Sequence, residues 1–468
     1  MKDQQPPSRF LGRRRFLGEI GCAALSTAPV LSSILNLRLI GQIAAAEAPA
    51  NNDYRALVCV FLAGGNDSFN MLAPVDVDGY AEYAATRGSV ALPVSDFTAL
   101  SGNLPDGRTL GLQNSMPNLR SLFEEEKAAF VCNVGTLVEP TDLASYSNGS
   151  VALPSGLFSH SDQQMHWHSS MPDNRSPESG WAGRMADLLD ELNGESQVSM
   201  SVSLDGINLF QSGAETVPIS LSANGIAPEL TSWNSASYLP KRTAIESILD
   251  AQYQNAFQRT FAKMKRNAIA VNAEYNDAVA LGDAVNTTFT TANNLSLKLS
   301  TVARTIAARA PLQKRRQTFF IIVPGWDLHG SLEANHPGLL GSVDVALGEF
   351  QTAMASLGLE DQVTLYSASD FARTLSSNGS GTDHAWGGNQ FVVGGAVNGG
   401  QFYGDYPELA LGSSLDTGRG RLIPTTSVDQ YFAEMACWMG VSQANLPMIL
   451  PNLSRFSSEG LGFLTPSP

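Results

Sequence analysis

Six segments of the chain have the apolar runs or the apolar–polar alternation that predict β-strands. They lie at residues 56–62, 128–134, 198–204, 318–323, 362–366 and 390–393. Continuous apolar runs are typical of strands that are buried on both faces of a sheet. Glycine, proline or polar residues follow most of these runs, and they mark the ends of the predicted strands.

Helical spacing of apolar residues lies between these segments, at 116–127, 180–192, 339–357 and 427–439. Strands that alternate with helices predict an α/β fold with a mostly parallel central sheet and helices on both faces. Residues 241–310 are long, rich in Ala, Asn and Arg, and poor in strand signals. We interpret them as a helical insertion that packs on or caps the sheet, with a plain crossover as the alternative. One domain is predicted for residues 47–468.

Three of the predicted strands lead into aspartates, which are Asp67, Asp327 and Asp370. In parallel α/β sheets, functional sites collect at the carboxyl ends of the strands. Each aspartate taken alone also fits a turn or helix-capping residue. Taken together, carboxylates at one sheet edge repel each other unless a cation or protons compensate them.

The composition narrows the class of protein. The 468 residues are 43% hydrophobic and 16% charged, with a formal net charge of −15. Such a chain is long and apolar enough to fold, which excludes wholesale disorder. The acidic balance argues against a nucleic-acid partner, because phosphate neutralisation needs a basic patch.

The first 46 residues have the features of a twin-arginine export signal. Arg13-Arg14-Arg15-Phe16-Leu17 precedes a weakly apolar stretch and the small residues Ala44-Ala45-Ala46; 46–48 is an alternative cleavage site. The apolar stretch contains Pro29, Asn36 and Arg38, so no permanent membrane span is expected. An amphipathic anchor helix is the alternative interpretation. We therefore predict a periplasmic or secreted protein that meets the twin-arginine translocase during export. Without residues 1–46 the formal charge is −19, because that segment holds six basic and two acidic residues.

The histidines are few and several lie beside aspartates. Of the six, His329 follows Asp327, His384 follows Asp383, and His160 is the first of three histidines in the stretch 159–168. Imidazole and carboxylate groups in such proximity are typical divalent-metal ligands. The trio His166-Trp167-His168 is expected at the surface or at an interface.

Four motifs then resemble a known family. They are GGNDSFN at 64–70, GWDLHG at 325–330, SDFART at 369–374 and GTDHAWGG at 381–388. Together they resemble the DUF1501 family of exported bacterial proteins, which is related to the alkaline phosphatase and sulfatase superfamily. The resemblance covers roughly residues 54–464, and it implies an alkaline phosphatase-like fold.

The resemblance also implies metal ligands, because the superfamily uses two divalent metals. Asp67 matches the first ligand, Asp327 and His329 resemble a later Asp and His, and His384 resembles the last His. Asp370 matches the Asp of an Asp-His pair, but Phe371 stands in the place of the histidine. One site would then hold Asp327, His329 and His384, with Asp383 adjacent, and the other Asp67 and Asp370. The ion is a divalent metal such as Zn²⁺, Mg²⁺ or Ca²⁺.

The candidate catalytic groups are Ser159, His160 and Arg373. Ser159 stands at the start of a predicted helix, where an anion is favoured, although it can equally be a helix cap. Ser68 is a second candidate nucleophile. Arg373 can hold a phosphate or sulfate through its planar guanidinium, or form a structural ion pair.

Two functions of different class follow. The first is a metal-dependent hydrolase of phosphate or sulfate esters, with a small anionic ester as substrate. The second is a non-catalytic cell-envelope binding or assembly protein that retains the fold. The missing histidine at position 371 motivates the second hypothesis.

Overall fold

The computed structural model describes residues 53–225, 235–457 and 459–465, so the predicted export signal lies outside the described residues. Within the described residues, nine strands form the central sheet: β1 (Arg55–Ala63), β5 (Ala128–Gly135), β6 (Ser201–Ser203), β7 (Ile219–Ser220), β8 (Arg316–Pro324), β9 (Val363–Ser369), β10 (Gly388–Val393), β11 (Phe402–Tyr403) and β12 (Thr426–Ser427). Their order is β11-β5-β10-β9-β1-β8-β6-β7, and β12 pairs with β5. All neighbours are parallel except β10, which is antiparallel to β5 and β9. The predicted α/β fold with a mostly parallel sheet is confirmed.

Strand β1 lies between β8 and β9 and shows why its sequence is continuously apolar. Val58, Val60 and Leu62 belong to the hydrophobic core on one face of the sheet. Leu57, Cys59 and Phe61 belong to the core on the other face. Because successive side chains of a strand point to opposite faces, a strand covered on both sides needs apolar residues at every position.

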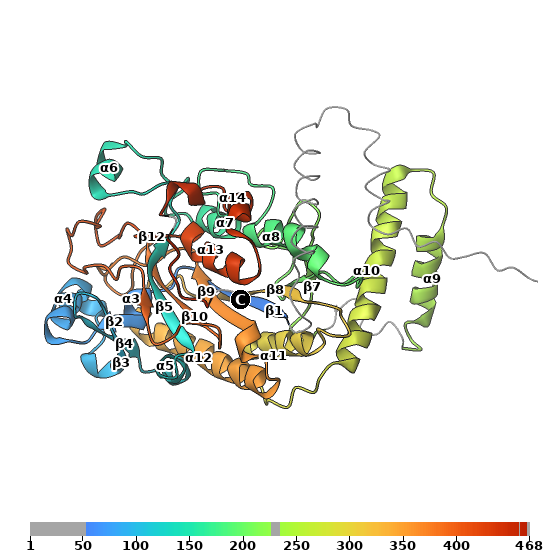
Figure 1. Ribbon diagram of the computed structural model, residues 1–468, viewed down its shortest axis with the longest axis horizontal. Helices are drawn as coiled ribbons and strands as arrows, with labels where there is room; N and C mark the ends of the chain where they lie inside the picture. The colour runs from blue at the N-terminus through green and yellow to red at the C-terminus, as the bar shows by residue number, and fades with distance from the viewer. Residues whose placement is uncertain (1–52, 226–234, 458, 466–468) are drawn as a thin grey trace, which may run out of the picture.

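Helices cover both faces of this sheet (Figure 1). The core on one face includes residues of α5 (Pro117–Glu124), α11 (Asn294–Ala307) and α12 (Leu332–Ser356). The core on the other includes residues of α7 (His160–Ser169), α8 (Trp181–Leu189), α13 (Val428–Trp438) and α14 (Leu446–Ile449). A small antiparallel sheet stands beside them, in the order β2 (Leu72–Pro74), β4 (Thr109–Gln113), β3 (Phe97–Asn103). Three further helices are α3 (Ser68–Met71), α4 (Val77–Arg87) and α6 (Leu143–Asn148).

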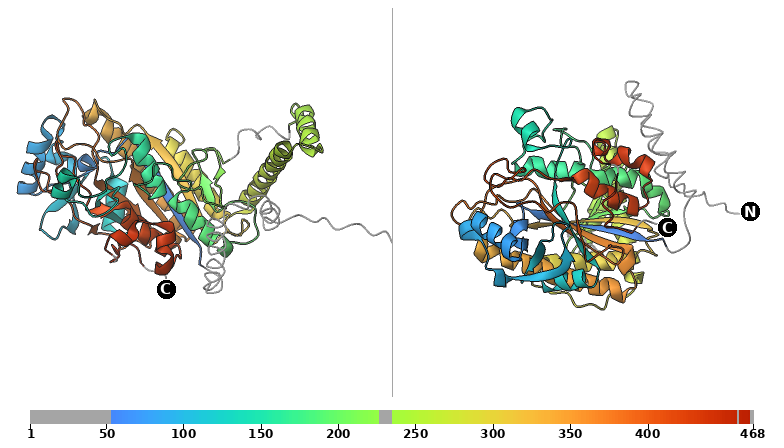
Figure 2. Two further views of the ribbon diagram at one scale, coloured as in Figure 1. Left: turned by 90° about the horizontal axis from the view of Figure 1, so that it is seen from above. Right: turned by 60° about the vertical axis from the view of Figure 1, so that its left-hand side comes forward.

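The segment predicted as a helical insertion forms α9 (Leu239–Asp250), α10 (Ala256–Leu281) and α11. Helix α11 packs on the sheet as expected, since Leu299, Val302 and Ile306 are fully buried in its core. Helix α9 and the first part of α10 instead project away from the body (Figure 2). None of the described helices is both long and apolar enough to cross a bilayer.

Other differences from the sequence predictions concern where elements begin and end and which side chains are buried. Strand β6 covers 201–203 rather than 198–204, and α12 begins at Leu332, upstream of the predicted 339. The prediction that 166–168 lie at the surface or at an interface is wrong for His166 and Trp167, which are buried within the chain. Trp167 packs against Tyr431 and Phe432, and His168 packs among aromatic rings of β1 and β8. Gln163, His166 and Trp167 follow the i, i+3, i+4 repeat of a buried helix face, which is hard to recognise in sequence because two of the three residues are polar.

The strand directions bring distant loops to one edge of the sheet. In the parallel register, Ala63 of β1 lies beside Pro324 of β8, and Leu62 lies beside Ser369 of β9, so these strands end together. Strand β10 is antiparallel, so it begins rather than ends near this edge, at Gly388. The loop before β10, which carries Asp383 and His384, therefore joins the loops that follow the parallel strands.

Candidate metal centre at the carboxyl edge of the sheet

Glycines allow the loops at this edge to approach each other closely. Gly64 has a φ of +123°, and a Cβ there would lie 2.4 Å from the backbone nitrogen of Asp327. A Cβ on Gly381 would lie 2.4 Å from the carbonyl carbon of His329. No L side chain fits either position without moving backbone. These contacts place the loop of Asp327 and His329 between the loop after β1 and the loop before β10.

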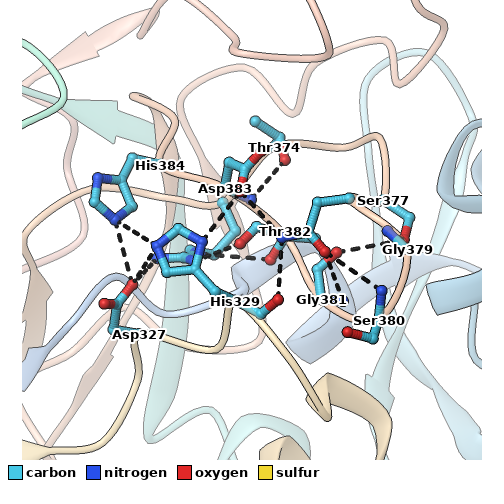
Figure 3. A network of polar contacts seen from close by, with 12 residues as sticks. Asp327, His329, Thr374, Ser377, Gly379, Ser380, Gly381, Thr382, Asp383 and His384 are labelled. Carbon is cyan, nitrogen blue, oxygen red and sulfur yellow. Dashed lines mark hydrogen bonds and ion pairs between the residues drawn. The ribbon is translucent and has the colours of Figure 1, made fainter.

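The carboxylate of Asp327 contacts the rings of His329 and His384 (Figure 3). Its Oδ1 lies 3.1 Å from Nε2 of His329 and 3.3 Å from Nε2 of His384. Those two ring nitrogens are 2.9 Å apart. Ligand atoms of a tetrahedral zinc ion, about 2.05 Å from the metal, are separated by about 3.3 Å. The three atoms therefore have nearly the spacing of one face of a zinc coordination tetrahedron.

The other nitrogen of each ring is held by an oxygen, which fixes the tautomer. Nδ1 of His384 lies 2.8 Å from the carbonyl oxygen of Phe158, and Nδ1 of His329 lies 3.1 Å from Oδ1 of Asp383. Since a carbonyl or carboxylate oxygen only accepts, each Nδ1 carries the hydrogen when the ring is neutral. Both Nε2 atoms then direct lone pairs toward Asp327. Carboxylate or carbonyl partners on the far nitrogen are the usual surroundings of a metal-binding imidazole.

His160 completes the pattern from helix α7. Its Nδ1 lies 2.5 Å from Oδ2 of Asp370, and its Nε2 lies 3.4 Å from Oδ2 of Asp327. That Nε2 is buried without a hydrogen-bond partner. One ligand atom from each of His160, Asp327 and His384 can be chosen so that all lie within 4.8 Å of one another. Three imidazoles thus present Nε2 to one carboxylate, and this donor set fits a divalent metal ion.

The sequence matches one family over most of this region. The family model described as "Protein of unknown function (DUF1501)" covers residues 54–418. The chain belongs to the DUF1501 family. No curated protein sequence matches it.

Solved structures show only distant similarity to this DUF1501 protein. The lipoteichoic acid synthase LtaP from Listeria monocytogenes is 11% identical; the match covers 88% of this chain and 80% of that one, with a TM-score of 0.33. The PsFucS1 sulfatase from Pseudoalteromonas sp. is 9% identical, with coverages of 88% and 73% and a TM-score of 0.34. Ps i-CgsB in complex with k-i-k-neocarrahexaose is 10% identical, with coverages of 84% and 74% and a TM-score of 0.32.

The electrostatics of the DUF1501 centre keep its acids ionised. Burial acts to raise the pKa of Asp327, but the hydrogen bond and charge of Arg373 outweigh it and leave the pKa below its ordinary value. A hydrogen bond from Asn378, with Arg419 and His329 nearby, lowers the pKa of Asp383 to about 2. Burial lowers the pKa of His384. Anionic carboxylates and a neutral imidazole are the protonation states that bind metal.

Asp370 and Asp383 contact the rings of the candidate ligands His160 and His329 through the nitrogen that faces away from Asp327. Asp370 is fully buried, and its Oδ2 accepts from Gly64 N and Gln164 Nε2 as well as facing His160. Asp383 lies between His329 and Arg419, 2.6 Å from the latter. Both carboxylates orient imidazoles. Gln164 lies four residues after His160, and this spacing in a helix was the available sequence signal for it.

The structure does not bring Asp67 into this cluster. Its carboxylate is 1% exposed and pairs with the buried guanidinium of Arg87 at 2.5 Å. Its Oδ2 also accepts from Oγ1 of Thr382 at 3.3 Å. A buried arginine at the end of α4 needs a counter-charge, and Asp67 supplies it. The expected second site of Asp67 and Asp370 is therefore not assembled, since each carboxylate has separate partners.

Arg373 is also engaged within the protein. It is fully buried and donates to Oδ1 of Asp327 at 2.7 Å, to the carbonyl of Gly64 at 3.1 Å, and to both oxygens of Thr382. These contacts favour the structural ion pair over the alternative of holding a substrate anion.

The two candidate nucleophiles differ in access. Ser68 is 1% exposed and accepts a hydrogen bond from Asn389 N, so it is closed to a substrate. Ser159 occupies the N-cap position of α7 but makes no capping hydrogen bond. Its half-buried hydroxyl lies 3.2 Å from that of Ser161. Ser159 thus remains the accessible hydroxyl directly before His160.

Proposed function

We propose that this protein is a metal-dependent hydrolase of phosphate or sulfate esters that acts outside the cytoplasm. The observation that carries the proposal is the convergence of Nε2 of His329, Nε2 of His384 and Oδ1 of Asp327, mutually 2.9–3.3 Å apart, on a partly exposed carboxylate. Such donors in a solvent-accessible position are typical of catalytic rather than purely structural metal sites.

Asp327, His329 and His384 would hold the ion, with His160 as a fourth donor, and a water would then be a fifth ligand. Three imidazoles and one carboxylate favour zinc over magnesium or calcium, which prefer all-oxygen sites. A bound divalent metal supplies Lewis acidity and a water of lowered pKa.

The chain's own residues define the rest of the site. Arg373 keeps Asp327 ionised and fixes its orientation through a 2.7 Å hydrogen bond. Asp370 and Asp383 hold the rings of His160 and His329. Ser159 does not cap the ten-residue helix α7, and the first backbone N–H groups of a helix have no acceptor within the helix. An anionic ester is favoured at such a helix end, with Ser159 as its nearest hydroxyl.

The test measures metal content and turnover on the same preparations. Wild type is expected to contain stoichiometric metal by elemental analysis and to hydrolyse members of an aryl and sugar phosphate and sulfate panel. Asp327→Asn should lose both, whereas Asp78→Asn, an exposed aspartate of α4, should lose neither. A metal-free wild type that gains no stability from added zinc contradicts the proposal.

Export is part of the proposal and has its own test. The motif Arg13-Arg14-Arg15-Phe16-Leu17 supports recognition by the twin-arginine translocase and release in the periplasm. Arg13→Lys/Arg14→Lys should leave the protein in the cytoplasmic fraction, as should deletion of the translocase. Export that is unaffected by either change contradicts this route.

A second function, non-catalytic binding or assembly in the cell envelope, is favoured by a specific observation. Arg373 already gives Asp327 a positive partner, and the ring of Phe371 lies 4.8 Å from that of His160 and 4.6 Å from that of His384. Under this function the ester panel stays flat, and His384→Ala lowers the melting temperature without any activity to lose.

A further inference from the structure

The projecting part of the helical insertion carries an exposed apolar surface. We call residues 239–266, which comprise α9 and the first part of α10, the hairpin. On α10, Phe257, Phe261 and Met264 are 87%, 61% and 66% exposed. Their spacing of four and three residues places them in one stripe along the helix.

Helix α9 extends the same surface. Ile248 is 58% exposed, and it lines a shallow groove of about 340 Å³ together with Phe257 and Phe261. The groove joins the apolar residues of the two helices into one patch. Exposed apolar patches on a water-soluble surface mark interaction sites more often than scattered apolar residues do.

The charge of the hairpin is opposite to that of the chain. It contains six basic and two acidic residues, in a protein whose formal net charge is −15. The two acids are paired with Arg242 and Arg266. Exposed Lys241 and Lys265 lie over the rings of Tyr238 and Phe261, so basic and apolar groups occupy the same surface.

A partner for this surface must accept aromatic side chains and offer negative charge over the same area. We propose that the hairpin binds the surface of a lipid bilayer that contains anionic phospholipids. Phenylalanine and methionine enter the boundary between headgroups and acyl chains, while lysine and arginine contact the headgroups. The hairpin projects from the body (Figure 2), so it can reach a bilayer while the acidic body stays away from the anionic surface.

The experiment is co-sedimentation of the full chain with phosphatidylcholine vesicles that contain or lack phosphatidylglycerol. Wild type is expected to sediment with the anionic vesicles, and high salt should weaken this, because screening reduces the electrostatic part. Phe257→Ser/Phe261→Ser should lower the apparent affinity about tenfold or more. Lys241→Glu/Lys265→Glu should lower it by about the same factor.

Matched controls separate the hairpin from general effects. Val77→Ser replaces an apolar residue of the body that is 85% exposed, and Arg120→Glu/Arg175→Glu makes the same charge change on exposed residues of the body. Both should bind as wild type does. All proteins share one N-terminus, so any contribution of residues 1–52 cancels in the comparison.

Three results would overturn the proposal. They are no binding by wild type, equal loss in hairpin and body variants, and a dimer in light scattering that the phenylalanine substitutions abolish while vesicle binding stays unchanged. The last would make the hairpin a contact between copies of the chain. Circular dichroism confirms that each variant is folded, and the exposure of the substituted side chains makes folding the expected outcome.

Discussion

The Nε2 atoms of His329 and His384 lie 2.9 Å apart, and the other nitrogen of each ring faces an oxygen. Two imidazole lone pairs at this distance repel unless a proton or a metal ion lies between them. Oδ1 of Asp327 adds a negative charge 3.1 and 3.3 Å away. We therefore expect the folded protein to bind a cation at this point.

Zinc binding is the first prediction. One equivalent of Zn²⁺ should bind, and at a free concentration of 100 Kd it should raise the free energy of unfolding by about 2.7 kcal/mol. His384→Gln should weaken binding far more than His166→Gln, whose ring contacts Ser155 outside the cluster. Isothermal titration with zinc, followed by urea unfolding, measures both quantities. Equal zinc affinity in the two variants would show that the ion binds outside the cluster of Asp327, His329 and His384.

The second prediction concerns Asp370, whose carboxylate contacts Nδ1 of His160. Asp370→Asn keeps an oxygen for Gly64 N but weakens the hold on the ring, so zinc affinity should fall about 10- to 100-fold. The matched change Asp361→Asn alters an exposed aspartate before β9 and should have no effect. Competition with a chromogenic chelator measures the affinities. An unchanged affinity in Asp370→Asn would exclude His160 from the ligand set.

The third prediction separates Asp67 from the metal. Arg87→Met leaves a buried carboxylate unpaired and should lower the free energy of unfolding by about 3–5 kcal/mol. Asp67→Asn in the same chain should recover part of this loss, because it removes the uncompensated charge. Zinc stoichiometry should stay at one in the double variant, as chemical denaturation and elemental analysis can establish. Loss of the metal in the double variant would instead indicate that Asp67 is a metal ligand.

Local patterns predicted six strands of the central sheet, namely β1, β5, β6, β8, β9 and β10, but not the short β7, β11 and β12. Continuous apolar runs identified β1, β5 and β8, and the aspartates that follow β8 and β9 do lie at one edge. Asp327, His329 and His384 were grouped by resemblance, and the structure brings them together. The strands and their ends were predictable because apolar periodicity is a local property of the sequence.

Tertiary pairing explains what the sequence did not reveal. Arg87 meets Asp67 across 20 residues, and His160 meets Asp370 across 210. No spacing rule connects such positions. The antiparallel direction of β10 was also unpredicted, since a short apolar run has the same pattern in either direction. The buried face of α7 was missed because its histidines and glutamines are polar in sequence.

The final prediction is a pH dependence that arises away from the metal centre. His168 packs against Phe61 and Phe320, and burial lowers its pKa from 6.5 to about 4. Between these two values the unfolded chain binds the proton and the folded chain does not, so stability falls as the pH is lowered through this window. The contribution is complete above about pH 6.5, and about 2 kcal/mol of it should be lost on going from pH 7 to pH 5. His168→Gln cannot titrate and should show a correspondingly smaller pH dependence, while the other histidines contribute equally to both proteins. Urea unfolding of wild type and variant at the two pH values gives the difference, and parallel losses would show that His168 is not protonated on unfolding in this range.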